Sequence, residues 1–242
     1  MTELILTAIM VGGATILGGG VGILFRRTSK TFTDGMLSFA AGVMLAAAMV
    51  GLILPAVESG GVFISVLGLF LGAICVNLLD LPVSFLSSGV DSSEIQRLRR
   101  VLLFVTAIAL HNLPEGIAAG VGIGAGEEVD GFLIALAIAL QNIPEGIIVS
   151  VAMIGVNIRP IKAFAIASLT GVIEIFGCFM GYFAASLSET FLPLVLALAG
   201  GTMLYVISEE MIPETHSEGS GRLSTYFLLI GFSLMLIIGE IF

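Results

Sequence analysis

An eleven-residue motif occurs twice in the apolar middle of the chain, as AIALHNLPEGI at 107–117 and AIALQNIPEGI at 137–147. The copies differ only at His111 against Gln141 and at Leu113 against Ile143. Each copy places polar residues and a Pro-Glu pair inside a segment that is otherwise apolar, where proline breaks helix hydrogen bonds and ionisable residues are costly. Because the chain carries the same energetically unfavourable residues in two places, we infer a functional role for both copies.

Composition shows what surrounds the motifs. The chain is 57% hydrophobic and only 11% charged, with a mean hydropathy of +1.14, which indicates an integral membrane protein. Apolar segments of about 20 or more residues, each long enough to cross roughly 30 Å of hydrocarbon, lie at 3–25, 34–57, 61–86, 101–124, 131–156, 161–187, 190–212 and 223–242. We therefore predict an all-α membrane protein with eight transmembrane helices.

Charge predicts the orientation. Every basic residue falls on alternate connections between the predicted spans: Arg26, Arg27, Lys30, Arg97, Arg99, Arg100, Arg159, Lys162 and Arg222. Such loops face the cytoplasm, so both termini are predicted to be extracytoplasmic. The net charge of −9 gives no sign of nucleic-acid binding, and the expected partner is the lipid bilayer. The longest polar insertion, 87–100, has 14 residues, so we predict a single domain over 1–242.

Three glutamates lie deep in the predicted spans. Glu115, Glu145 and Glu174 are each 12 to 15 residues from the nearest loop charges on both sides. At 1.5 Å per residue this depth is roughly 18 to 22 Å, which is near the membrane midplane. Together, three such acids cost about 8 to 10 kcal/mol on an insertion scale. Since all basic residues are in predicted cytoplasmic loops, a bound cation is the better source of neutralising charge.

Helical spacing groups the polar side chains. His111 lies four residues before Glu115, and Gln141 lies four before Glu145, so each pair shares a helix face. Asn112 and Asn142 precede the same glutamates by three residues, and the motif prolines are predicted to open a kink. Imidazole, carboxylate and amide groups suit zinc, iron or manganese. Polar groups that bond only to one another would explain one copy but explain two copies and Glu174 poorly.

The duplication also predicts a transport mechanism. The fourth and fifth predicted spans run in opposite directions, so their equivalent residues reach the same depth when an axis in the membrane plane relates the helices. Inverted pairs around a midplane site are typical of alternating-access transporters. We therefore predict an inverted pair at the core of the protein.

The motifs HNLPEG at 111–116, QNIPEG at 141–146 and SEEMIPETH at 208–216, in a chain with eight predicted spans, resemble the ZIP (Zrt/Irt-like) metal transporters, in particular their short prokaryotic GufA-like branch. The resemblance implies uptake of divalent transition metals across the bacterial cell membrane into the cytosol, and suggests a homodimer. Zinc is the first expected ion, followed by iron, manganese and cadmium, each as a substrate and none as a cofactor. No enzymatic activity is expected.

The resemblance also assigns ligands, including Met44, which its position alone would class as a packing residue. The first metal position would use Met44, His111, Glu115, Gln141 and Glu145. The second would use Asn112, Asn142 and Glu174, with Glu115 and Glu145 bridging. The same comparison implies that Glu209 and Glu210 assist metal release and that Glu58 and Asp34 line the approaches. His216 is interpreted as a solvated loop histidine, with an exit ligand as the alternative.

Two other function classes remain open at this point. An intramembrane metallohydrolase also buries His and Glu, but it typically carries an HExxH motif, which this sequence lacks. A metal-permeable cation channel can use rings of glutamates. The inverted pair and the soft ligand set favour a transporter over both.

Overall fold

The computed structural model describes residues 1–24, 29–85, 93–125, 128–186, 191–216 and 221–241. Within these ranges the side chains of 79–85, 93–100, 102–104, 107, 110, 111, 128–130, 186 and 241 are not described. The imidazole of His111, a predicted metal ligand, therefore lies outside the described residues, although its backbone is helical.

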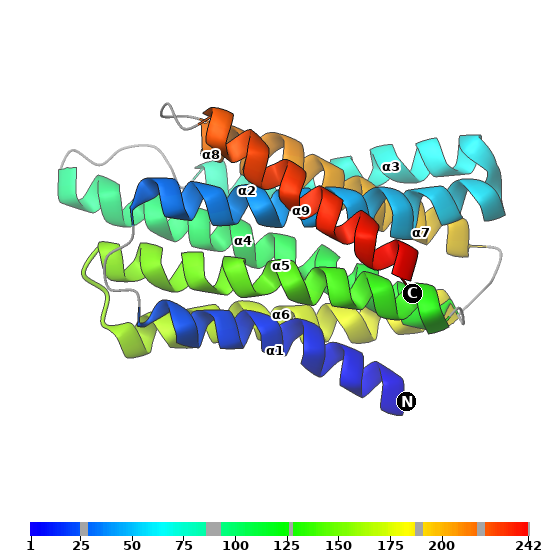
Figure 1. Cartoon of the computed structure of the whole chain (residues 1–242), viewed down its shortest axis with the longest axis horizontal. Helices are drawn as coiled ribbons and strands as arrows, with labels where there is room; N and C mark the ends of the chain where they lie inside the picture. The colour runs from blue at the N-terminus through cyan, green and yellow to red at the C-terminus, as the bar shows by residue number, and fades with distance from the viewer. Residues whose placement is uncertain (25–28, 86–92, 126–127, 187–190, 217–220, 242) are drawn as a thin grey trace.

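Every element in the described part of the chain is helical, which confirms the all-α prediction (Figure 1). In chain order the elements are α1 (Thr2–Gly22), α2 (Lys30–Ala46), the π-helix η1 (Ala47–Ile53), α3 (Leu54–Phe85), α4 (Ser93–Gly124), α5 (Glu128–Gly155), α6 (Pro160–Ser186), α7 (Leu192–Val206), the π-helix η2 (Ile207–Met211), α8 (Ile212–His216) and α9 (Gly221–Ile241). Helices satisfy their own backbone hydrogen bonds, as apolar surroundings require.

Length and hydropathy identify six candidate membrane spans among the described residues: Thr2–Gly22, Lys30–Leu78, Gly131–Gly155, Pro160–Ala185, Leu192–His216 and Gly221–Glu240. The second has 49 residues, more than twice the length that one crossing needs, and it contains the predicted segment 34–57 and most of the segment 61–86. The predicted segment 101–124 lies within α4. Eight crossings thus remain a prediction, while each predicted segment does contain helix.

A glycine marks the turn inside the 49-residue stretch. Gly61 has φ 78° and ψ 164°, a region that favours glycine, and it interrupts the helical geometry of α3. In Figure 1 the chain reverses in this stretch, and α3 packs against η1. The 49-residue stretch begins with α2, where the Ser29 hydroxyl accepts a hydrogen bond from the Phe32 N–H (3.2 Å) and caps the N-terminus of the helix.

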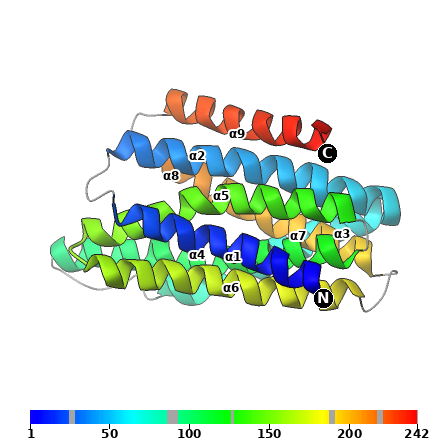
Figure 2. The ribbon, with the colours of Figure 1, turned by 60° about the horizontal axis from the view of Figure 1, so that its bottom comes forward.

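The helices form two groups. In the first, α1 packs on α5 and α6, and α4 packs on α6 and α5. In the second, α2 packs on α9 and α3 packs on α7. Figure 2 shows α5 between α2 on one side and α1 and α6 on the other. Because α5 contacts α2 and α4 contacts α7, the two helices that carry the repeated motif lie where the groups meet.

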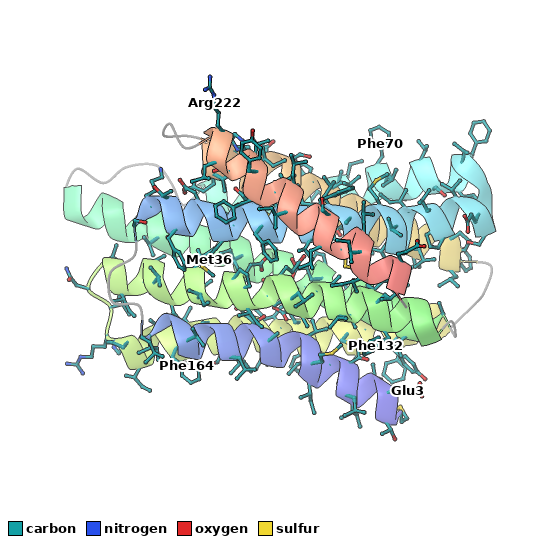
Figure 3. All side chains as sticks on the ribbon, in the orientation of Figure 1. Glu3, Met36, Phe70, Phe132, Phe164 and Arg222 are labelled. Carbon is teal, nitrogen blue, oxygen red and sulfur yellow. The ribbon has the colours of Figure 1, made fainter. Side chains whose placement is uncertain are left out.

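The start of α1 and the end of α9 lie at the same end of the bundle in Figures 1 and 2, which is the arrangement that an even number of crossings predicts. Glu3 and Arg222 lie towards opposite ends in Figure 3. Large apolar side chains project outward, among them Phe63 (93% exposed) and Phe70 (67% exposed), the second of which is labelled in Figure 3. Exposed phenylalanines of this kind fit contact with lipid.

Candidate metal site

The polar residues of both motifs are buried within the bundle. Asn112 and Glu115 lie on α4, and Gln141, Asn142 and Glu145 lie on α5; none is more than 4% exposed. α4 and α5 contact each other, and only residues 125–127 separate them, so the two helices are antiparallel. Both helices continue through the proline of their motif, Pro114 in α4 and Pro144 in α5.

Glu174, on α6, is the centre of a hydrogen-bond network. Its Oε1 atom accepts hydrogen bonds from the Thr15 hydroxyl (2.7 Å) and from Nδ2 of Asn112. Its Oε2 atom accepts one from Nδ2 of Asn142 (2.6 Å), which also donates to the Val11 carbonyl oxygen (3.2 Å). The donors come from α1, α4 and α5, so this one fully buried carboxylate joins the four helices of the first group.

Other polar atoms in the same region have no hydrogen-bond partner. These atoms are both carboxylate oxygens of Glu115, the Oδ1 oxygens of Asn112 and Asn142, and both side-chain polar atoms of Gln141, whose amide lies beside the Glu115 carboxylate without the geometry of a full hydrogen bond. Leaving a buried acceptor without a partner costs about 1 to 3 kcal/mol, and more when the group is charged, so unsatisfied groups are rare in native proteins. A cation bound among these oxygens would satisfy them, which makes this region a candidate metal site.

The charges of the buried acids lead to the same interpretation. Glu115 lies close enough to Glu145 and to Glu174 for the three carboxylates to repel one another when ionised. The lysines and arginines with described side chains are Lys30, Arg159, Lys162 and Arg222, and all four are exposed. Because these four side chains are exposed, none of the described lysines and arginines is buried together with Glu115, Glu145 and Glu174.

The glycine of each motif allows two helices to approach closely. A Cβ atom on Gly116 would overlap the backbone oxygen of Glu174 in α6, and a Cβ on Gly146 would overlap that of Thr15 in α1. Close backbone contact through small residues is a common way for membrane helices to pack. The two copies of the motif therefore dock α4 and α5 against the helices that carry Glu174 and Thr15.

Met44 lies in α2, outside the first group, and is 1% exposed. It belongs to the main apolar core, which also contains Ala118 of α4 and Ile138 of α5. Among the described residues, no group of three or more His, Cys, Asp or Glu side chains is arranged to hold a metal ion.

A family model described as ZIP Zinc transporter matches residues 87–239, which include both copies of the repeated motif, Glu174 and the SEEMIPETH motif at 208–216. The chain belongs to the ZIP zinc transporter family. This finding confirms the resemblance predicted from the three motifs. The family and the apolar helices together indicate a multi-pass membrane protein.

Individual relatives are also named zinc transporters. Zinc transporter ZIPB of Bordetella bronchiseptica is 37% identical over 92% of this ZIP chain and 76% of the relative. Zinc transporter GufA of Myxococcus xanthus is 47% identical over 57% of this chain and 54% of the relative. Zinc transporter ZIP11 of Homo sapiens is 30% identical over 93% of this chain and 92% of the relative.

The remaining predicted residues of this ZIP chain lie away from the motifs in sequence, towards the helix ends. Asp34 is buried near the start of α2, and Glu58 is exposed in α3. Glu209 is exposed and Glu210 half-buried in η2. His216 is exposed as predicted, but it ends α8 and does not lie in a loop: its ring contacts the Ile212 carbonyl oxygen (2.9 Å) and the Thr225 hydroxyl (3.2 Å).

The sequence interpretation missed Thr15. This residue is fully buried, and its hydroxyl donates a hydrogen bond to Glu174, which lies 159 positions later in the sequence. The segment 12–22 is rich in glycine and predicts only close helix packing. A threonine among small residues gives no sign of a distant carboxylate partner, so no signal in the sequence could have identified it.

Proposed function

We propose that this ZIP protein transports divalent transition-metal ions, with zinc as the first substrate, across the cell membrane into the cytosol through the buried site between α4 and α5. The observation that carries the proposal is the set of buried oxygen atoms without hydrogen-bond partners on Glu115, Gln141, Asn112 and Asn142. A membrane protein that buries acids and acceptors without protein cations offers them to a cation from solution. The relatives that are named zinc transporters support zinc as that cation.

The first metal position in this proposal uses Met44, His111, Glu115, Gln141 and Glu145. Thioether, imidazole and carboxylate ligands together suit zinc, iron, manganese and cadmium better than sodium or potassium. Burial of Met44, Glu115, Gln141 and Glu145 supports this assignment, because a site enclosed by protein strips water from the ion. The buried carboxylates supply the charge that replaces the lost hydration.

The second position uses Asn112, Asn142 and Glu174, with Glu115 and Glu145 shared between the two ions. The hydrogen bonds that join both amides to Glu174 support this grouping. Two positive ions at neighbouring positions would offset the repulsion among the three carboxylates. The second position thus depends on Glu174 more than the first does.

Glu174→Gln is therefore expected to reduce the number of zinc ions bound per chain, and to slow uptake, while one ion remains bound. The amide keeps the size of the carboxylate but loses its charge. Elemental analysis of the purified variant after equilibration with zinc measures the ratio. The same ratio and rate as in the parent protein would contradict the second position.

The proposed route leads from the end with both termini, outside the cell, past the buried site to the end with the exposed basic residues, in the cytosol. Glu58 lies on the outer side, whereas Asp34, Glu209 and Glu210 lie on the inner side. Movement of α1, α4, α5 and α6 as one group, by an elevator-like or rocking motion, would expose the site alternately. The network around Glu174, which joins these four helices, supports their movement as a unit. A homodimer is part of the same proposal.

Zinc flux into proteoliposomes tests the function. We expect saturable uptake that iron, manganese and cadmium inhibit, measured with competing metals and across a pH gradient. Glu3→Gln, an exposed change at the start of α1, is the matched control and should transport like the parent. Unsaturable, ohmic conductance would replace the proposal with a channel, and proteolysis without flux would replace it with a metallohydrolase.

A further inference from the structure

Among the described residues, Thr15 is the one hydrogen-bond partner of the Glu174 side chain that lies on neither copy of the motif. It is located on α1, a helix that otherwise contributes mainly small residues, and its hydroxyl donates to Oε1 of Glu174 at 2.7 Å. The residue is 0% exposed, so water does not compete for this bond. A hydrogen bond from a buried hydroxyl to a carboxylate is among the stronger kinds in proteins.

The two asparagine amides share one orientation relative to Glu174. Each directs its Nδ2 atom to a different oxygen of that carboxylate, Asn112 to Oε1 and Asn142 to Oε2. An ionised carboxylate only accepts hydrogen bonds, so an amide turned by 180° would place oxygen against oxygen. The charge of Glu174 therefore fixes which way both amides face.

This orientation leaves both amide oxygens free. Oδ1 of Asn112 and Oδ1 of Asn142 are buried and have no hydrogen-bond partner, as have both oxygens of Glu115. Amide and carboxylate oxygens are ligands for divalent cations. If either amide turned over, the site would lose an oxygen ligand and gain an N–H group that repels the ion.

Glu174 can orient the amides only while its own carboxylate plane is fixed. The last torsion of a glutamate has a broad energy well, so packing leaves it partly free. Thr15 and Asn112 both donate to Oε1, and Asn142 donates to Oε2, which sets the plane of the carboxylate from three helices. Without the hydroxyl, the carboxylate can turn and one amide loses its acceptor.

We propose that Thr15 is a positioning residue of the metal site, which holds Glu174 so that Asn112 and Asn142 present their Oδ1 oxygens to the transported divalent cation. The inference rests on the proposed function and extends it to a residue of α1. It also explains why Gly146 brings the backbone of α5 against that of Thr15. The contact that brings the hydroxyl within reach of the carboxylate joins α1 to α6, where a Cβ atom on Gly171, three residues before Glu174, would lie 3.2 Å from the Cβ of Thr15.

Zinc uptake by Thr15 variants in proteoliposomes, together with zinc binding by calorimetry, tests the proposal. Thr15→Val keeps the shape and removes the hydroxyl, and we expect the KM for uptake and the Kd for zinc to rise about tenfold. Thr15→Ser restores the donor and should stay within about twofold of the parent in both constants. Thr202→Val is the matched control, since this buried hydroxyl donates only to Ala199 of its own helix (2.6 Å), and should leave both constants unchanged.

A double-variant cycle separates positioning from packing. In a Glu174→Ala background, Thr15→Val should raise the KM no further, because the hydrogen-bond acceptor through which Thr15 acts is already absent. An equal increase in both backgrounds, or no increase in either, would overturn the proposal. A packing defect would lower the amount of active protein, and hence the maximal rate, without changing the Kd.

Zinc binding and uptake by the parent protein separate the proposed transport function from the proposed positioning role of Thr15. A parent that binds zinc but takes none up overturns the proposed transport, while the Kd values of the Thr15 variants still decide the positioning role. A parent that neither binds nor takes up zinc overturns both. Uptake by the parent with unchanged constants in Thr15→Val overturns the positioning role alone.

Discussion

Glu115→Gln is expected to weaken zinc binding by at least about 30-fold, because it removes the charge of a buried carboxylate from the metal site. The same substitution should raise the melting temperature of the metal-free protein. Glu115 is buried away from water, both of its oxygens lack hydrogen-bond partners, and Glu145 and Glu174 lie close enough to repel its charge, so replacing the acid with a neutral amide removes a destabilising group. Calorimetric titration with zinc measures the first effect, and thermal unfolding in detergent without metal measures the second.

Weaker zinc binding together with a higher melting temperature would distinguish a metal ligand from a residue needed for folding. A residue needed only for folding would lower both the stability and the apparent affinity when changed. Glu3→Gln removes the same charge from an exposed position and should alter neither quantity. Parent-like zinc affinity in Glu115→Gln would exclude this carboxylate as a ligand.

Gly146→Ala is expected to reduce zinc uptake at least about tenfold, because an added methyl group has no room where α5 meets α1. The new Cβ would overlap backbone atoms of Thr15 and Gly19, which cannot rotate away as a side chain could. The two helices must then separate, which lengthens the path between Thr15, Asn142 and Glu174. Uptake in proteoliposomes and the fraction of monodisperse protein in detergent measure the effect.

Gly155→Ala provides the matched control on the same helix. A Cβ atom there has nothing within 4 Å, so this variant should behave like the parent. Because alanine favours helix over glycine in both places, only the difference in helix contact separates the two variants. Similar uptake by both would show that the close approach of α5 and α1 is not needed for function.

Several features of the site follow from the sequence because they depend on local spacing. Glu115 and Glu145 each follow an asparagine by three residues and a polar residue by four, and an α-helix places such residues on one side. The sequence also predicted the helical class and the ZIP family, both of which are confirmed. The number of crossings, the inverted pair and the ligand roles stay predictions.

Other features depend on which helices meet, and spacing along the chain carries no information on that. The motif glycines Gly116 and Gly146 follow the glutamates in sequence, but their role as contact points with Glu174 and Thr15 appears only in the packed bundle. The sequence predicts that His216 is solvated, and the residue is exposed, but its contact with Thr225 of α9 also appears only in the packed bundle.

By itself, then, the sequence determined that two polar motifs lie within apolar helices, since hydropathy and helical period act between neighbours in the chain. Only the tertiary structure decided which oxygens are satisfied and which are left for an ion. Glu174 takes its donors from α1, α4 and α5, and those bonds turn the oxygens of Asn112 and Asn142 away from it. Hydrogen bonds between distant helices require that both partners be brought together first, so they exist only once the bundle has packed.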